Sequence, residues 1–201
     1  MQQPIVPDLP FPRAEHLERQ ARLRAKLKED GFDAMLVFAQ ESMFWLTGYD
    51  TGGFVFFQCL VVTADEKPFV LLTRRPDLLQ ARRTSTIEDI RIWWDAEDAN
   101  PARDLKVILE ELGLGGKRLA VELNTHGLTG WNLWRLQKTL DGFCTLDNDN
   151  HMIRKLRLIK SPAEIEYVRK AGEILDRSLD AVIAAARHNT ASVAARSGGR
   201  P

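Results

Sequence analysis

The sequence SMFWLTGYDTGGFVFFQCLVV, residues 42–62, is the stretch around which the rest of the chain is organised. It opens with a short aromatic helix or turn at residues 43–46, breaks at Thr47-Gly48, exposes residues 49–51 and bends again at Gly52-Gly53. The apolar run that follows predicts a long strand covered on both faces, because almost no polar residue interrupts it. The loop before this strand is where we expect a ligand or a second subunit to meet the domain.

The composition is that of an ordinary globular protein, with 44% hydrophobic and 28% charged residues among 201. This length predicts one full domain and part of another. Lysines plus arginines and aspartates plus glutamates both number 28, which argues against a nucleic-acid binder or an anionic-membrane binder. No apolar run reaches the roughly 18 residues that a membrane span needs, and the N-terminus does not resemble a secretory signal.

The two cysteines fall in segments that we predict to be buried strands, around Cys59 and Cys144. We therefore expect reduced core thiols rather than a disulfide. Together with the absence of a signal sequence, this favours a cytoplasmic location.

Periodicity predicts an alternation of helices and strands after an extended, proline-rich arm at residues 1–12. The expected helices are residues 13–30, 76–83, 101–112 and 128–140, and the expected strands beyond the opening stretch are residues 34–39, 69–72, 90–94, 118–123 and 143–146. The short polar turn at residues 65–68 predicts a hairpin between the long strand and residues 69–72. This pattern indicates an α/β domain with a mixed sheet over residues 13–150.

The character of the chain changes near residue 150 and becomes basic at residues 154–160. Ser161, Pro162 and Glu164 then form a capping box with proline in the first turn, which strongly predicts the start of a helix. Its apolar face continues to about residue 186 and needs something to pack on. We expect residues 151–186 to be a junction and the first helix of a truncated second domain, and residues 187–201 to be a disordered tail.

Familiar catalytic and metal-binding patterns fail on their spacing. The Asp147 to Asn150 run lacks the glycine and the closing glutamate of a calcium loop, and Gly113 to Arg118 lacks the spacing of a phosphate loop. Tryptophans at four positions are more typical of a core or an interface than of a cofactor platform: Trp93, Trp94, Trp131 and Trp134. The four histidines lie far apart, and none has the spacing of a zinc site: His16, His126, His151 and His188.

Two segments resemble the creatinase, prolidase and aminopeptidase P family, the pita-bread metallohydrolases. Residues 42–49, SMFWLTGY, are similar to the family's aromatic-Leu-Thr-Gly-aromatic motif. Residues 157–166, RLIKSPAEIE, with RKA at 169–171, resemble the hallmark at the start of the catalytic domain, and this second motif is the more specific. The resemblance covers residues 11–186.

This resemblance implies a creatinase-type N-terminal domain, α/β with a ribonuclease-H-like mixed sheet. In the family it precedes a pita-bread domain in which two Asp, one His and two Glu hold two divalent metals, manganese, cobalt or zinc. All five ligands lie beyond the residues of this chain, so no catalytic or metal-ligating residue can be carried over. The chain by itself is expected to be inactive.

The resemblance also implies a role for the loop from Tyr49 to Phe54, which in the family supports dimers and reaches the partner's active-site mouth. We name Tyr49, Asp50, Thr51 and Phe54 as the substrate-gating or dimer loop. Creatine-cleaving members place an arginine where Phe56 stands, and a neutral ring cannot form a bidentate pair with a carboxylate. Packing is the simpler interpretation of Phe56 and Trp45, whereas packing and substrate contact are equally open for Tyr49 and Phe54.

The leading hypothesis is therefore the N-terminal dimerisation and substrate-gating domain of a cytoplasmic, homodimeric Xaa-Pro peptidase or related C–N amidohydrolase. Its substrate would be a peptide or a small amide, without nucleic acid or membrane partners. Two alternatives remain open: a non-catalytic protein-interaction module of the same fold, or a remnant of a truncated gene.

Overall fold

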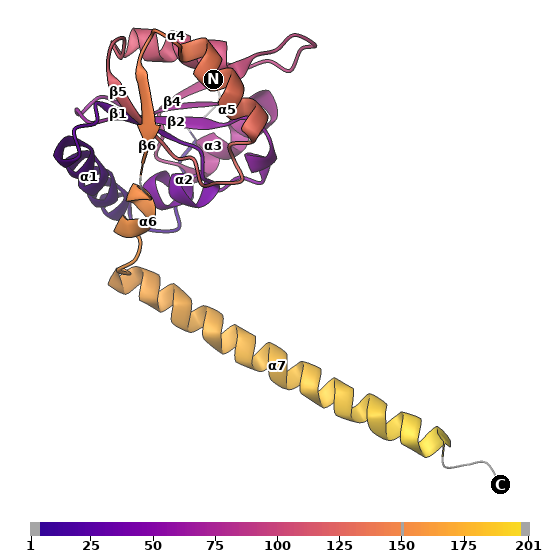
Figure 1. Cartoon of the computed structure of the whole chain (residues 1–201). Coiled ribbons are helices and arrows are strands. Elements are labelled where there is room, and N and C mark those ends of the chain that lie inside the picture. The colour runs from indigo at the N-terminus through magenta and orange to yellow at the C-terminus, as the bar shows by residue number, and fades with distance from the viewer. Residues whose placement is uncertain (1–4, 150, 198–201) are drawn as a thin grey trace. The chain divides into compact units, whose positions relative to one another are not determined.

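The computed structural model describes residues 5–149 and 151–197, with side chains described as far as Arg187. It divides into two units, Met1–Leu158 and Ile159–Pro201, which are treated separately below. The first unit holds a sheet with helices on both faces, and the second holds one long helix (Figure 1).

One mixed sheet of six strands forms the centre of the first unit, in the order β4-β3-β2-β1-β5-β6. The strands are β1 (Ala34–Val37), β2 (Cys59–Thr63), β3 (Val70–Arg74), β4 (Asp89–Trp93), β5 (Arg118–Val121) and β6 (Thr145–Asn148). Strand β2 runs antiparallel to both β1 and β3, whereas the pairs β1–β5, β3–β4 and β5–β6 are parallel. The predicted mixed sheet and the β2–β3 hairpin are thus confirmed.

Helices cover the two faces of this sheet in two groups. One face is covered by four helices: α1 (Arg13–Glu29), α2 (Gln40–Thr47), α3 (Leu78–Thr84) and α6 (Met152–Leu156). The other face is covered by α4 (Pro101–Glu111) and α5 (Gly130–Leu140) (Figure 1). Short 3₁₀ turns, η1 (Gly53–Val55) and η2 (Arg75–Asp77), lie in the connections. Helix α4 begins where predicted, because the Asn100 side chain accepts a hydrogen bond of 3.2 Å from the Ala102 amide.

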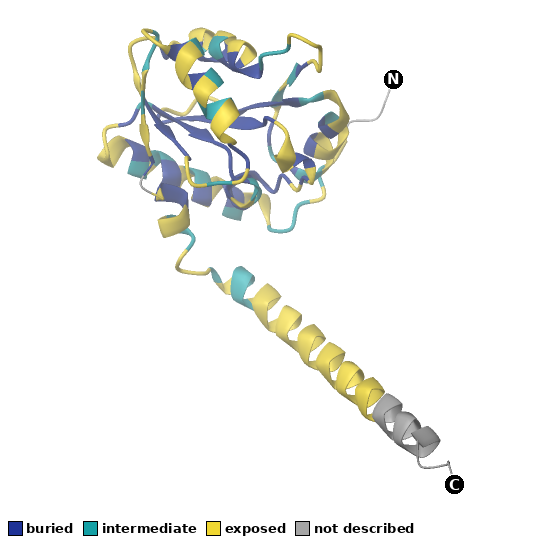
Figure 2. Ribbon diagram, turned by 45° about the vertical axis from the view of Figure 1, so that its right-hand side comes forward, coloured by how far each residue is buried: buried dark blue, intermediate teal, exposed yellow. Residues whose placement is uncertain are grey.

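Strand β1 shows how the sequence divides the core between the two faces. Met35 and Val37 pack with the α1 and α2 side, whereas Leu36 packs with the α4 and α5 side, and all three are fully buried. Successive side chains of a strand point to opposite faces, so an uninterrupted apolar strand is one that has helices on both sides. Figure 2 shows the result as a dark blue sheet between helices that are blue only on their inner sides.

The prediction of a long strand directly after Gly53 is wrong about where the strand begins. Residues 53–55 form a 3₁₀ turn, and β2 begins only at Cys59. Three of the aromatic and aliphatic side chains that suggested a buried strand are exposed: Phe54, Val55 and Phe56. This turn precedes the sheet, so its apolar side chains lack the cover that the strand residues from Cys59 onward receive.

The two cysteines and the tryptophans differ in how deeply they are buried. Cys59 is buried in β2 as expected, but Cys144 is only half-buried and precedes β6; both thiols are free. The core interpretation holds for Trp93, which donates a hydrogen bond of 2.9 Å to the Phe57 carbonyl. The side chains of Trp94, Trp131 and Trp134 are exposed, so for them only the interface half of the prediction stays open.

In the second unit, the capping box predicted at Ser161 is present. The Ser161 amide donates to the Glu164 carboxylate at 2.7 Å, and the Glu164 amide donates to the Ser161 hydroxyl at 3.2 Å. The helix that follows, α7 (Pro162–Ser197), does not end near residue 186. The prediction of a disordered tail is therefore wrong for residues 187–197, whose alanines and arginines favour a helix; residues 198–201 lie outside the described residues.

Within the described residues, no helix combines the length and the apolar character that crossing a membrane would require.

Candidate functional site: the crevice at the ends of β1 and β5

The sheet topology singles out the carboxyl ends of β1 and β5. These neighbouring parallel strands lead into α2 and α5, which lie on opposite faces of the sheet. Where two such connections diverge, the chain leaves an opening beyond the strand ends, and α/β proteins commonly bind ligands there. The carboxyl ends of β1 and β5 are therefore a candidate functional site.

A buried carboxylate fixes the chain at this point. Glu122, directly after β5, accepts hydrogen bonds from the amides of Phe38 at 3.1 Å and Ala39 at 2.8 Å, and from the Ser42 hydroxyl at 2.6 Å. The residue that precedes α2 is Ala39, which has no side-chain acceptor. Glu122 thus supplies from 83 positions away the anionic cap that the helix start lacks locally.

Burial raises the pKa of Glu122, and the hydrogen bonds from Ser42 and Ala39 oppose that shift. The carboxyl group has all of its strong contacts inside the protein, with donors at both oxygens. We interpret Glu122 as a structural anchor of the crevice rather than as a free acid or base.

The segment after Glu122 is held against β1 by a close backbone approach. A Cβ atom on Gly127 would lie only 2.1 Å from the Phe38 carbonyl oxygen, so only glycine fits. The Gly127 amide donates to the Thr125 hydroxyl at 3.1 Å, and Arg154 donates to the Asn124 carbonyl at 2.7 Å. These contacts give the crevice a defined far wall.

The resulting crevice has a volume of about 360 Å³. Two apolar side chains, Phe54 and Leu123, each 39% exposed, line it together with polar and charged groups, namely Gln40, Glu41, Asn124, Thr125, His126 and Arg154. Such a surface can contact a small apolar group while an arginine and a histidine face an anionic or carbonyl group. Among the described residues that line it, no hydroxyl or thiol is hydrogen-bonded to a side-chain base.

Of the four residues predicted to gate a substrate, two are exposed and two are buried. Phe54 reaches the crevice, and Asp50 is exposed. Tyr49 and Thr51, in contrast, are buried, with 0% and 1% of their surface accessible. The expectation that residues 49–51 are all exposed is therefore wrong for Tyr49 and Thr51. The reason is that α2 ends at Gly48 and turns the chain inward.

Under the loop lies a group of buried polar side chains. Tyr49, Gln58, Thr73 and Asp77 are each less than one-tenth exposed, and burial raises the pKa of the Tyr49 phenol. Gly53 permits this arrangement, because a Cβ there would lie 2.3 Å from the Gln58 amide nitrogen and 2.5 Å from an Asp77 oxygen. The loop therefore packs on polar groups. The Thr51 hydroxyl accepts a hydrogen bond of 2.9 Å from the Gly53 amide, which closes the turn.

Phe56 does not belong to the core, contrary to the packing interpretation. Its ring is 43% exposed and lies under the Arg74 guanidinium, 3.2 Å from the ring centroid. Arg74 also contacts Asp77 at 3.5 Å and Asp95 at 3.3 Å. Trp45 is buried as expected.

Sequence reasoning missed Glu41, His126 and Arg154 as members of one site. The side chain of His126 is exposed and lies in the crevice wall. The signal that could have found two of these residues is positional, because Glu41 and His126 each follow closely on a predicted strand, at residues 34–39 and 118–123.

The crevice does not fit a metal centre. Among the described residues, no three histidine, cysteine, aspartate or glutamate side chains are grouped closely enough to hold an ion. The described part of the crevice offers only Glu41 and His126 of these types, fewer ligands than a stable site requires.

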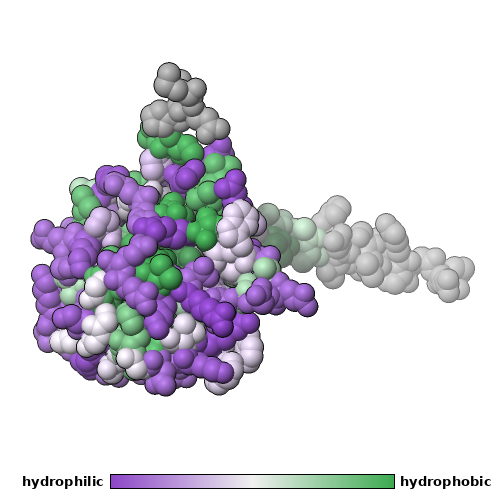
Figure 3. Space-filling model, turned by 90° about the horizontal axis from the view of Figure 1, so that it is seen from above, coloured by the Kyte–Doolittle hydropathy of each residue, from purple (hydrophilic) through white to green (hydrophobic). Residues whose placement is uncertain are grey.

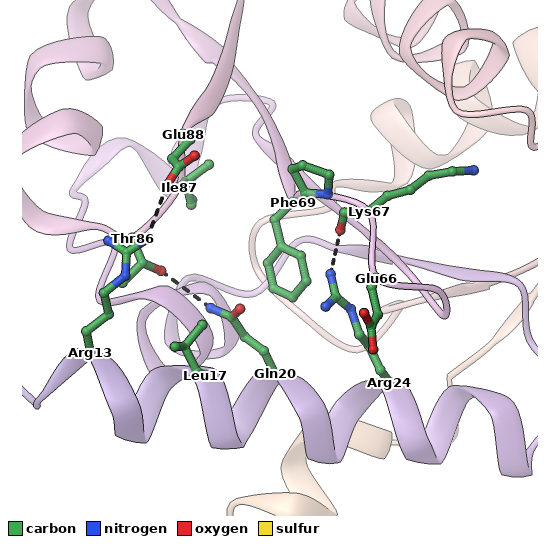
Figure 4. A pocket seen from close by; sticks show the side chains of 11 residues that line it. Arg13, Leu17, Gln20, Arg24, Glu66, Lys67, Phe69, Thr86, Ile87 and Glu88 are labelled. Atoms are coloured by element: carbon green, nitrogen blue, oxygen red, sulfur yellow. Dashed lines mark hydrogen bonds and ion pairs between the residues drawn. The ribbon is translucent and has the colours of Figure 1, made fainter.

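A second depression, drawn in Figure 4, lies between α1 and the segments around Lys67 and Thr86. Its polar groups are paired with one another. Arg13 contacts Glu88 at 3.2 Å, Gln20 donates to Thr86 at 3.4 Å, and Arg24 donates to the Lys67 carbonyl. With a volume of only about 220 Å³, it is best explained as a seam that fastens α1 to the sheet.

Comparison with known proteins settles the family. The sequence pattern of the creatinase/prolidase N-terminal domain matches residues 19–159, well over half of the chain. The chain belongs to this family. The crevice, the loop and Glu122 all lie inside the matched region of this creatinase N-terminal domain.

Relatives of this creatinase N-terminal domain are longer hydrolases. An ectoine hydrolase of Halomonas elongata is 29% identical over 178 residues, which cover 85% of this chain and 44% of that enzyme. A dipeptidase of Pyrococcus horikoshii is 25% identical with a TM-score of 0.68, over 83% of this chain and 44% of the dipeptidase. The chain therefore spans a little under half the length of the curated relatives it matches.

A separately solved domain also matches the chain. It is the N-terminal domain of the cytoplasmic peptidase PepQ from Mycobacterium tuberculosis, 25% identical with a TM-score of 0.54. The match covers 70% of this chain and 98% of that domain. The six-stranded mixed sheet with helices on both faces is thus the fold of N-terminal domains in this hydrolase family.

Proposed function

We propose that this creatinase N-terminal domain forms one wall of the substrate site of a dinuclear-metal hydrolase that cleaves a C–N bond. The substrate class is an Xaa-Pro peptide or a related small amide. The observation that carries the proposal is the position of Phe54: the family's loop brings this partly exposed ring to the crevice at the ends of β1 and β5.

The lining of the crevice supports a role in substrate selection. An aromatic ring and Leu123 suit the apolar part of a dipeptide, and Arg154 and His126 suit its carboxylate or carbonyl oxygens. Arg154 also donates to Asn124, which keeps its guanidinium beside the crevice. In this role Phe54 and Asp50 act as gating residues, while Tyr49 and Thr51 position the loop from beneath.

The chemical step belongs to other residues in this proposal. Two divalent metals, manganese, cobalt or zinc, would be held by a pita-bread domain outside the 201 residues, since the described residues offer no suitable ligand set. The first part of such a domain is the interpretation we give to α7, whose start carries the family's hallmark motif. The chain on its own would then be inactive.

Dimerisation and location are further parts of the proposal. The exposed loop edge at Asp50 and Phe54 is the surface that would contact a second subunit in the full hydrolase. A cytoplasmic location is supported by the related PepQ, which is described as a cytoplasmic peptidase, and by two free thiols.

Binding of a simple substrate to the isolated chain tests this proposal. Alanyl-proline titrated into the ¹⁵N-labelled protein is expected to shift amide resonances at residues 123–127 and at Phe54, with a Kd on the order of 1 mM or weaker. Phe54→Ala should weaken binding, whereas Trp94→Ala, which alters another exposed ring, should not. Shifts that are absent, or that centre on another surface, would refute the role of the crevice.

A non-catalytic interaction module is the second candidate, favoured by one observation. Helix α7 exposes a stripe of apolar side chains that a helix normally buries: Val168, Ile174, Leu175, Leu179, Val182 and Ile183, each between 46% and 64% exposed. A protein partner would cover such a stripe as well as a catalytic domain would. Failure of alanyl-proline to bind anywhere on the chain would favour this candidate.

A further inference from the structure

The outer faces of α4 and α5 form a groove that the proposed hydrolase role does not use. It has a volume of about 580 Å³. Helix α4 contributes Arg103 and Lys106, one turn apart, and α5 contributes residues at helical spacing on one stripe: Trp131, Trp134, Arg135 and Lys138. The inner stripes of the same helices fill the core, so these outward side chains are not needed for packing.

Two tryptophans form the apolar floor of this groove. Their rings stack with centroids 4.9 Å apart and an interplanar angle of 15°, and they remain 59% and 49% exposed. A single exposed apolar residue needs no explanation, but two stacked indoles form a rigid contact surface. Tryptophan and arginine are the residue types that most often dominate the binding energy of protein interfaces.

The cations around the indoles have no carboxylate partner in the described part of the chain. Arg135 lies over the Trp131 ring at 5.1 Å, Lys138 over the Trp134 ring at 5.0 Å, and Lys106 over Phe143 at 5.3 Å. Among the described lining residues, Asp98 is the single acid against four cations.

Several other surface cations of the same protein are paired with a carboxylate. Arg118 contacts Asp147 at 2.6 Å, Lys117 contacts Asp33 at 3.3 Å, and Arg91 contacts Glu111 at 3.2 Å. The depression beside α1 likewise pairs its own charges. The groove on α4 and α5 therefore combines an uncompensated positive charge with an uncovered aromatic surface. Figure 3 looks down on this side of the first unit, where hydrophilic atoms surround smaller apolar areas.

We propose that the α4–α5 groove binds an acidic segment of a partner protein, which places an apolar or aromatic side chain on the Trp131–Trp134 pair. Carboxylates of the segment would pair with the four cations. Charge complementarity is the argument for an acidic occupant. A nucleic acid would also stack on indoles, but the chain carries 28 basic and 28 acidic residues, without the basic excess typical of such binders.

Fluorescence anisotropy with defined probes tests the proposal on the intact chain. The probes are a fluorescein-labelled peptide of alternating glutamate and leucine, the matching peptide of lysine and leucine, and an oligothymidylate of similar length. We expect saturable binding of the acidic peptide alone, weaker at high salt because exposed charges are screened. Sedimentation velocity of the same samples reports any self-association.

Matched variants locate the site. Arg135→Glu with Lys138→Glu should raise the Kd at least about tenfold, whereas Arg82→Glu with Arg83→Glu, the same charge change on the exposed side of α3, should leave it within about twofold. Trp131→Ala should raise the Kd about fivefold. Trp94→Ala removes another exposed indole and should not change it. Circular dichroism confirms that each variant is folded.

Four results would overturn the proposal. The acidic peptide fails to saturate, or both double variants lose binding equally. The oligothymidylate binds more tightly than the peptide, which would make the groove a nucleic-acid site. The wild-type chain self-associates and binds no peptide, and the Arg135→Glu with Lys138→Glu variant does not self-associate; this result would assign the groove to a second copy of the chain.

Discussion

Helices α4 and α7 begin with similar capping signals but differ in how far their apolar stripes are buried. Both have a capping side chain before proline in the first turn, Asn100 before Pro101 and Ser161 before Pro162. Both carry an apolar stripe at helical spacing. In α4 that stripe is buried, with Leu105 and Leu109 fully inaccessible, whereas in α7 Leu179 is 50% exposed.

This difference separates what starts a helix from what stabilises it in a fold. Capping and periodicity are local, and they predicted both helices from sequence. Burial depends on whether another element covers the stripe. Helix α4 has the sheet beneath it, whereas the described part of the second unit holds no other helix or strand that could cover α7. The predictions below use this contrast, from the largest expected effect to the smallest.

Truncating one leucine in each helix should give the largest contrast. Leu105→Ala removes a fully buried side chain from the core, and we expect a loss of about 3 kcal/mol in the free energy of unfolding. Leu179→Ala removes a half-exposed side chain and should change it by less than about 0.5 kcal/mol. Urea titration followed by tryptophan fluorescence measures both. Equal losses in the two variants would mean that the stripe of α7 is covered.

Removing the anchor at the crevice should have the next largest effect. Glu122→Ala leaves the buried amides of Phe38 and Ala39 and the Ser42 hydroxyl without their acceptor, at a cost of about 2–3 kcal/mol. Glu122→Gln keeps one acceptor oxygen and should cost less than half as much. If the alanine variant were as stable as the glutamine variant, Glu122 would not hold the start of α2.

Stability should also depend on the charge of Glu122. Its pKa is raised in the folded state, so the native protein binds the proton more tightly than the unfolded chain does. The free energy of unfolding should therefore fall as pH rises from the ordinary value near 4.5 to the raised value, and then level off. Asp149 shifts in the same direction, so the comparison is with Glu122→Gln, which lacks this contribution. A difference between wild type and variant that does not change with pH would contradict the assignment.

The smallest effects are expected at the two helix caps. Asn100→Ala should lower the free energy of unfolding of the first unit by about 1 kcal/mol, because the Ala102 amide loses its acceptor. Ser161→Ala breaks one half of the capping box and should reduce the helical signal of α7. It should leave the fluorescence transition of the first unit unchanged. A shift of that transition by Ser161→Ala would argue that the two helices are stabilised in the same way.

Much of the fold follows from local pattern. The uninterrupted apolar run of β1, the turn before β3 and the capping residues of α4 and α7 are local signals, and all were predicted. The 3₁₀ turn at residues 53–55 was missed because an apolar run looks the same whether it enters a sheet or turns outside it. The end of α7 was missed because a small, polar segment was taken as disordered, although alanine and arginine favour a helix.

The site was predicted only in part. The motif around Thr47 and Gly48 led to Phe54, but Tyr49 and Thr51 proved to be buried supports of the loop. His126 and Arg154 could not be joined to Phe54 from sequence, since they meet only when β5 pairs with β1. Glu122 was missed for the same reason, because its hydrogen-bond partners lie 80 or more residues away.

The central proposal is that the described residues supply a binding wall, while the catalytic groups belong to another domain. Its most direct test is to incubate the purified chain with alanyl-proline and manganese or cobalt, and to measure the release of proline. The account predicts release equal to that of buffer with metal alone. Release that rises with protein concentration and disappears with a chelator would contradict it.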